Sequence, residues 1–263
     1  MAATLGRFRL RPQNRWRMIG LTLVLALFVT GCAADRAYRE RQGRIARDLG
    51  ERYYAANQSS KALEQFLRAL EFNPDDPFLH YDLALAYVDK KQFETAEIHL
   101  KEAIRLKPDY SSAHNYLGVL YFRKGKVDLA IESYKKALSN LLWTKPQLAQ
   151  LNLAIAYLSL KQYQKAVVHF QEAIKLVPSY VDAHNGLGQA YEGLRMYGEA
   201  RLAYEKALEY NPVYTRTLLN LGKLLYHSGE RQKATEYFDR VVKLEPDSDI
   251  AKEALRYLRA PGK

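Results

Sequence analysis

Histidines are the side chains of this chain with the clearest capacity for metal binding or acid–base chemistry. The chain has six, and five of them fall at two recurring places, namely His80, His114 and His184 at one and His99 and His169 at the other. Equivalent positions of stacked helical units lie about 10 Å apart. Bonds from imidazole to zinc are near 2 Å, so neighbours in such a stack cannot share an ion. We therefore expect packing or surface roles and no metal site, with His227 alone on another face.

Other signatures of chemistry are missing from the sequence. It contains no HExxH, CxxC, P-loop or GxSxG motif and no acidic metal cluster. Its one cysteine, Cys32, excludes an intrachain disulfide and a cysteine-based metal site. We therefore expect no enzyme activity, no catalytic residues, no cofactor and no small-molecule substrate.

A repeated pattern organises most of the chain. The stretch from Pro77 to Tyr110 reads PFLHYDLALAYVDKKQFETAEIHLKEAIRLKPDY. Apolar residues first recur on one helical face, the polar run 90–92 interrupts them, and a second apolar face follows. The first face holds Leu83, Ala84 and Tyr87, and the second holds Ala96, Leu100 and Ala103. This pattern predicts two amphipathic helices joined by a short polar turn.

The same pattern returns with a period of 34 residues, lengthened by two residues in the third unit. The six units are 43–76, 77–110, 111–146, 147–180, 181–214 and 215–248. The period and the recurring L-G-x-x-Y, A-x-x-x-F, A and P positions resemble the tetratricopeptide repeat family. The resemblance implies an all-α fold, a right-handed superhelix (α-solenoid) of six helical hairpins. Residues 249–263 are expected to form a capping helix and tail, and Ala166 is expected to be buried.

The N-terminal segment has a different composition. Residues 1–17 are basic, and Met18 begins a run of twelve mostly apolar residues, too short to span a bilayer comfortably. This is the layout of a secretory signal peptide over 1–31. The following Val29-Thr30-Gly31-Cys32 is similar to the bacterial lipobox, which implies cleavage before Cys32 and its lipidation (palmitate). An ordinary signal peptide, or an uncleaved anchor, with an incidental cysteine is the alternative.

The residues after the lipobox bear on location. By family analogy, Ala33 favours an outer-membrane lipoprotein facing the periplasm over the inner membrane. Residues 32–42 are expected to be a short charged tether, which reaches roughly 35 Å when fully extended. The net charge is +11, but five arginines precede Cys32, so the remainder carries +6. We therefore expect no nucleic-acid partner.

In the tetratricopeptide family, recurring positions of each first helix line a concave groove. The resemblance implies a partner-binding groove with an apolar middle, formed by Phe78, Tyr81, Leu85, Asn115, Val119, Phe122, Leu148, Leu151, Ile155 and Leu158. Neighbouring helices could instead cover these residues. Asn115 and Asn185 match the asparagine type of the carboxylate-clamp variant. The second and fourth units lack its basic residues, so a receptor for C-terminal peptides is disfavoured.

Lipobox, short tether and six repeats together resemble the type IV pilus biogenesis lipoproteins, or secretin pilotins. This resemblance implies a scaffold that binds a protein client, a secretin or pilus assembly subunit, and holds the membrane through lipidated Cys32. One alternative is an interaction subunit of another envelope machine, such as exopolysaccharide export or cell-envelope assembly. A regulatory subunit of an enzyme and a binder of glycan or peptidoglycan are further alternatives, and a nucleic-acid binder is the least favoured.

Overall fold

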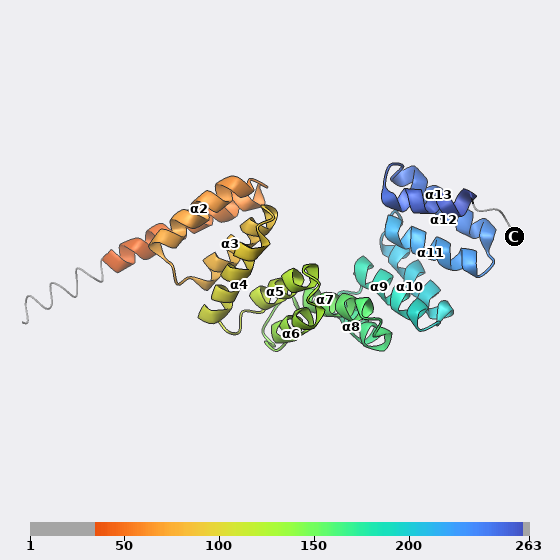
Figure 1. Ribbon diagram of the computed structural model, residues 1–263, viewed down its shortest axis with the longest axis horizontal. Helices are drawn as coiled ribbons and strands as arrows, with labels where there is room; N and C mark the ends of the chain where they lie inside the picture. Colours follow the sequence, from red (N-terminus) through yellow and green to blue (C-terminus); the bar gives the residue numbers. More distant parts are fainter. Residues whose placement is uncertain (1–34, 260–263) are drawn as a thin grey trace, which may run out of the picture. The chain divides into compact units, whose positions relative to one another are not determined.

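The computed structural model describes residues 35–259, which are helical with short turns and contain no β-strand (Figure 1). The expected signal peptide, Cys32 and residues 260–263 lie outside this range. Contacts divide the chain into a first unit ending at Leu106 and a second unit beginning at Lys107. The all-α prediction is confirmed, and each unit is a stack of helical hairpins.

The first unit contains two hairpins. Its helices are residues 35–55, α2 (Ser59–Phe72), α3 (Pro77–Asp89) and α4 (Phe93–Leu106). Residues 35–42, expected to be a tether, are helical and continue into the first repeat. At about 1.5 Å per residue they span about 12 Å, and the Arg39 guanidinium donates a hydrogen bond to the Glu71 carbonyl at 2.9 Å. This part of the segment therefore belongs to the folded unit.

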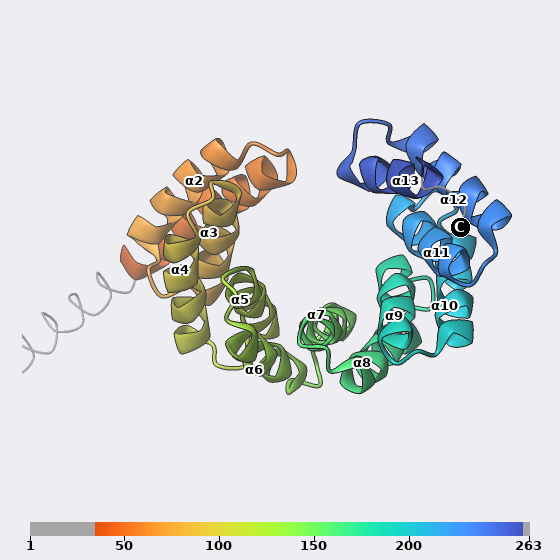
Figure 2. The same ribbon diagram turned by 45° about the vertical axis from the view of Figure 1, so that its right-hand side comes forward.

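The second unit contains four hairpins and a final helix, which can be followed by their labels in Figure 2. Its helices are α5 (Ser111–Arg123), α6 (Val127–Leu138), α7 (Pro146–Ser159), α8 (Tyr163–Leu176), α9 (Val181–Gly193), α10 (Tyr197–Tyr210), α11 (Thr215–His227), α12 (Arg231–Leu244) and α13 (Asp249–Arg259). Each odd-numbered helix from α5 to α11 packs against its successor, and α7 also contacts α5 and α9. The first helices of successive repeats therefore form one layer.

A left-handed residue ends the first helix of every repeat. Within residues 35–259, the residues with positive φ are Asn57, Lys91, Gly125, Lys161, Arg195 and Gly229. The next amide reaches back five residues, as where Gln92 N–H donates to the Tyr87 carbonyl at 2.9 Å and Gln162 N–H to the Tyr157 carbonyl at 2.9 Å. This is the Schellman arrangement, which satisfies carbonyls left over at a helix end. It fixes the turn of each hairpin.

Small residues on the first helix make room for a ring on the second. A Cβ added at Gly118 would lie 2.5 Å from Tyr134, and one added at Gly222 would lie 2.7 Å from Phe238. Both rings are fully buried. Ala166, predicted to be buried, is 0% exposed. The close approach of the helices therefore depends on the small side chains of the repeat pattern.

Histidines hold the repeat boundaries. Nε2 of His80, His114 and His184 lies 2.8–2.9 Å from the carbonyl oxygen of the proline six residues earlier. His80 also meets His99 of the same repeat, with 2.9 Å between their Nδ1 atoms. Because Nε2–H of His80 donates to Pro74, its Nδ1 accepts from His99. The expectation compared only equivalent histidines of different repeats, whereas this pair forms across one hairpin.

The last helix covers the end of the second unit. Ala251 and Ala254 of α13 are buried in one cluster with residues of α11 and α12, and the Tyr257 ring stacks on Phe238 at 5.0 Å. The Ser248 side chain accepts a hydrogen bond from Ala251 N–H at 3.0 Å, capping the helix start. The capping role predicted for this helix fits these contacts.

Candidate protein-binding surface

Polar side chains connect the first helices of neighbouring repeats. In the second unit, Asn152 on α7 donates to Asn115 on α5 at 3.0 Å, and Asn220 on α11 donates to Asn185 on α9 at 3.0 Å. The fifth residue of one repeat thus contacts the sixth of the next. Asn115 is 8% exposed. Asn115, predicted to line the groove, is therefore buried within the layer of first helices, where its amide oxygen accepts the hydrogen bond from Asn152.

The apolar residues predicted on α7 separate into two groups. Leu148 and Ile155 are each 36% exposed, whereas Leu151 is only 9% exposed. Leu158 is partly buried and packs on the core cluster that contains Leu151. The outward-facing part of α7 is therefore Leu148 and Ile155, two helical turns apart.

Helix α5 adds apolar side chains next to this surface. Val119 and Phe122 are partly buried and pack against the same core cluster as Leu151. The α5–α7 strip is defined as Val119, Phe122, Leu148 and Ile155 on these two helices, which contact each other. Four of the six apolar residues predicted in the second unit (Val119, Phe122, Leu151 and Leu158) belong to or pack against one core cluster, whereas Leu148 and Ile155 are exposed on α7.

The predicted residues of α3 belong to the first unit. Phe78 is 41% exposed, and the Arg47 guanidinium lies 5.4 Å from the centre of its ring. Tyr81 and Leu85 are partly buried. The same Arg47 donates to Asp82 at 2.9 Å and also contacts Asp76 at 3.3 Å. This face of the first unit is therefore aromatic and charged.

Charge and burial oppose each other at the Arg47 ion pair. Burial raises the pKa of Asp82 to about 6, although the hydrogen bond and positive charge of Arg47 act to lower it. A buried carboxylate needs its partner at neutral pH. Arg47 is therefore a structural side chain of the first layer, in the position that Asn115 and Asn185 occupy in their repeats.

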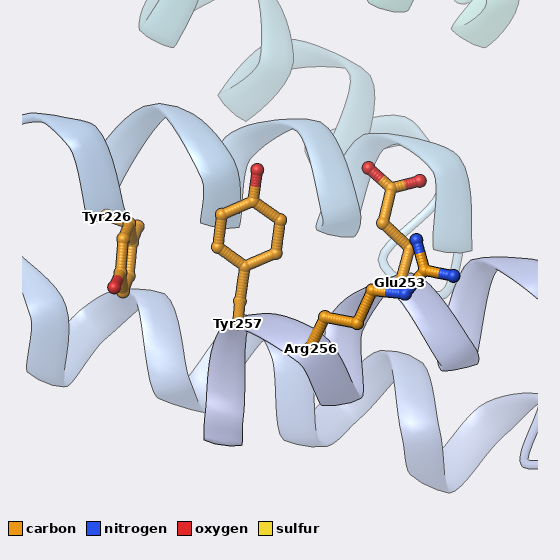
Figure 3. Close-up of a pocket in the computed structure, with 4 residues that line it drawn as sticks. All are labelled: Tyr226, Glu253, Arg256 and Tyr257. Atoms are coloured by element: carbon orange, nitrogen blue, oxygen red, sulfur yellow. The ribbon is translucent and has the colours of Figure 1, made fainter. Parts of the chain in front are cut away.

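An open cavity of about 340 Å³ lies between α11 and α13, and its lining residues are Tyr226, Glu253, Arg256 and Tyr257. Figure 3 shows Glu253, Arg256 and Tyr257 following one another along α13, with Tyr226 beside Tyr257. The two tyrosine rings meet edge to face at 5.2 Å. Such a cavity, with aromatic walls and a few polar groups, can hold a side chain of a bound peptide.

A salt bridge fixes one wall of this cavity. Lys223 donates to Glu253 at 2.8 Å. Burial acts to lower the pKa of Lys223, but the hydrogen bond and charge of Glu253 raise it above its ordinary value. The side chains that line this cavity were not among the predicted groove residues. Extending the groove positions into the capping helix would have found Glu253 and Tyr257.

Two properties of the described residues bear on other functions. No cluster of three or more histidine, cysteine or acidic side chains suited to a metal ion occurs among residues 35–259. Within the same range, no helix has the length and apolar character needed to cross a bilayer.

Stacked helical hairpins with a continuous layer of first helices define a helical-repeat scaffold for protein interactions. Family models described as TPR repeat match residues 50–91 and 154–194. Models described as Tetratricopeptide repeat match residues 81–141, 181–212 and 215–248. The chain belongs to the tetratricopeptide repeat family, as its sequence pattern predicted.

Solved structures share this fold. PilW, a widely conserved type IV pilus biogenesis factor, superposes with a TM-score of 0.75 at 22% identity, over 81% of this chain and 98% of PilW. PilF of Pseudomonas aeruginosa superposes with a TM-score of 0.74 at 19% identity, over 83% of this chain and 98% of PilF. At these identities the likeness establishes the fold.

Curated relatives match through their repeats. The antiviral innate immune response effector IFIT1 of Macaca fascicularis is 26% identical over 216 residues, which are 73% of this chain and 45% of IFIT1. The chain thus spans less than half the length of this relative.

Proposed function

We propose that the protein is a lipid-anchored scaffold of the bacterial envelope that binds a secretin or pilus assembly subunit and assists type IV pilus biogenesis. The observation that carries this proposal is the structural likeness to PilW and PilF, which extends over 98% of each of those proteins. PilW is a type IV pilus biogenesis factor. An interaction subunit of another envelope machine, for exopolysaccharide export or cell-envelope assembly, is the second candidate.

The anchor in this proposal is lipidated Cys32, in the outer membrane and facing the periplasm. Its support is the lipobox-like Val29-Thr30-Gly31-Cys32. Several acyl chains, at about 0.8 kcal/mol per buried CH₂, hold a protein firmly on a bilayer. Mass spectrometry of the N-terminal peptide from purified membranes tests this directly. An acylated cysteine supports the anchor, and an unmodified or still extended N-terminus contradicts it.

The client is proposed to bind the α5–α7 strip in the second unit. Leu148 and Ile155 supply exposed apolar area there. In this interpretation the open cavity between α11 and α13 receives a further side chain of the client, because Tyr226 and Tyr257 offer apolar walls and Arg256 a positive charge. Apolar anchors surrounded by polar groups are the usual composition of a binding surface.

The test is affinity capture from detergent-solubilised envelopes with three full-length proteins. These are the wild type, Leu148→Glu/Ile155→Glu, and a matched control, Val168→Glu/Leu202→Glu. Val168 on α8 and Leu202 on α10 are 53% and 67% exposed, so all four changes are at surface positions. Circular dichroism checks that the helical content is equal.

We expect the wild type and the control to capture a secretin or pilus component. The α7 variant should capture at least tenfold less of it. Equal capture by the α7 variant would remove the strip as the client site. Capture of a polysaccharide-export or cell-wall assembly component instead would contradict the pilus assignment and favour the second candidate.

A further inference from the structure

The loop between α6 and α7, residues 139–145, exposes two leucines almost completely. Leu141 is 94% exposed and Leu142 is 89% exposed, and Trp143 follows them. The two extra residues of the third repeat fall in this segment. Two adjacent leucines that project fully into solvent are unfavourable unless something covers them.

The loop is a formed turn. Asn140 Nδ2 donates to the Asp109 carbonyl at 3.0 Å, which ties the loop to the start of the unit. Asn140 Oδ1 accepts from Leu142 N–H at 3.0 Å, and the Asn140 carbonyl accepts from Trp143 N–H at 3.2 Å. Two backbone donors at the tip are thus satisfied within the loop. Backbone groups that enter the edge of a bilayer need such internal partners.

The charged residues that flank the loop most closely along the chain are lysines, although the loop is tied to Asp109, whose carboxylate pairs with Lys107 at 3.1 Å. Residues 133–171 contain five lysines and no aspartate or glutamate. Lys135 and Lys136 lie in the last turn of α6, and Lys145 stands immediately before α7. Lys136 pairs with Glu132 at 3.0 Å. Lysines on both sides of an apolar tip suit the phosphates of anionic lipids.

We propose that this loop is a second membrane contact, which inserts Leu141 and Leu142 at the headgroup–acyl boundary of a bilayer containing anionic phospholipid. Trp143 then lies at the level of the headgroups, where indole rings are enriched, and Lys135 and Lys145 face phosphates. A protein partner would require only the exposed leucines of the loop. Satisfied tip amides and flanking lysines together favour the lipid surface. The proposal does not rest on lipidation of Cys32 or on the pilus assignment.

Trp143 provides a probe at the site itself, because the chain has one other tryptophan, Trp16. The full-length Trp16→Phe protein is reconstituted into phosphatidylcholine vesicles with or without phosphatidylglycerol, and with or without brominated acyl chains. We expect the Trp143 emission to shift to shorter wavelength and to be quenched by brominated lipid when phosphatidylglycerol is present.

Two variants in this background make the test specific. Leu141→Ser/Leu142→Ser should lose the shift and the quenching while keeping its melting temperature, because both side chains are solvent-exposed. Val168→Ser/Leu202→Ser, at exposed apolar positions of α8 and α10, should keep both signals.

A Trp143 signal unaffected by brominated lipid, or equal quenching in the loop variant, overturns the proposal. So does a signal that changes only when envelope protein is added, since the occupant is then a protein. Because the readout is at Trp143, its failure leaves the anchor at Cys32 untouched.

Discussion

Replacing Gly188 by alanine should destabilise the second unit, although alanine is the better helix former. Gly188 lies on α9, and a Cβ there would be 2.4 Å from Cε1 and 2.6 Å from Cδ1 of Tyr204. Tyr204 is 0% exposed, and its hydroxyl donates a hydrogen bond to Glu192. The ring is therefore held against α9 by its hydroxyl, one turn beyond Gly188, and cannot withdraw from that helix without losing the bond.

The size of the effect follows from two opposing contributions. Overpacking a well-filled core costs about 1–3 kcal/mol. Replacing glycine by alanine within a helix gains about 1 kcal/mol. The net loss of unfolding free energy is therefore up to about 2 kcal/mol, which lowers the melting temperature by up to about 8 °C. Urea unfolding followed by circular dichroism measures it.

The matched control is Gly198→Ala on α10, where no atom lies within 4 Å of the added Cβ. There we expect a gain of about 0.5–1 kcal/mol. The second repeat carries alanine and leucine at the two contacting positions, Ala84 and Leu100, both fully buried. Gly188→Ala/Tyr204→Leu should therefore be more stable than the two single effects predict. A stabilising Gly188→Ala, or strictly additive effects in the double variant, would refute the steric reasoning.

Three further outcomes follow from burial, titration and backbone geometry. Ala166→Asp should lower the free energy of unfolding by about 3–5 kcal/mol, because it buries an unpaired charge. The control Val168→Asp, at a 53% exposed position, should change it by less than about 0.5 kcal/mol. Similar melting temperatures for the two variants would be inconsistent with this difference. Burial and the neighbouring His80 lower the pKa of His99 to about 4, below the ordinary 6.5, so the unfolded chain takes up the proton first. Stability should fall by about 1–2 kcal/mol from pH 8 to pH 5, and His99→Gln should flatten that dependence in urea unfolding; parallel pH profiles would contradict it. Arg195→Gly should raise the free energy of unfolding by about 0.5–1 kcal/mol, and with it the urea midpoint, because Arg195 has a φ of +61°. A lower midpoint would show that the arginine side chain stabilises the turn.

The fold could be predicted because its determinants are local and repeated. Each hairpin needs small residues on two faces and a polar break, and these recur at a period visible in the sequence. Ala166 could be assigned to the core because it sits at a position that is alanine in every unit. The left-handed turn residue was less visible, since lysine or arginine occupies it at Lys91, Lys161 and Arg195.

The candidate surface was harder to predict because a face of a helix does not reveal what the neighbouring helix covers. Leu151 and Ile155 are both groove positions by register, yet they differ fourfold in exposure, 9% against 36%. Pairings across one hairpin or between repeats, such as His80 with His99 and Asn115 with Asn152, depend on helix placement.

The packing around the Phe170 ring shows how a residue outside the repeat pattern affects helix placement. In the fourth repeat alanine, Ala154, stands where the next repeat has Gly188, yet the facing ring Phe170 is fully buried. Room for the ring is found on the next helix instead, because a Cβ at Gly186 would lie 2.3 Å from Phe170 Cζ. The sixth position of the other repeats is Asp, Tyr or Asn. A glycine outside the repeat pattern thus compensates for the alanine within it.

The spacing of exposed side chains on α7 defines what a client must offer. Leu148 and Ile155 are seven residues apart, which is about 10.5 Å along a helix. An amphipathic client helix matches this with apolar residues at i and i+7, and an extended segment matches it with residues at i and i+3, about 10 Å apart. The extended segment presents those two residues on opposite faces, because strand side chains alternate. Both anchors can therefore meet the same strip only from a helix, or from a strand that is kinked between them, and the α5–α7 strip favours a helical client.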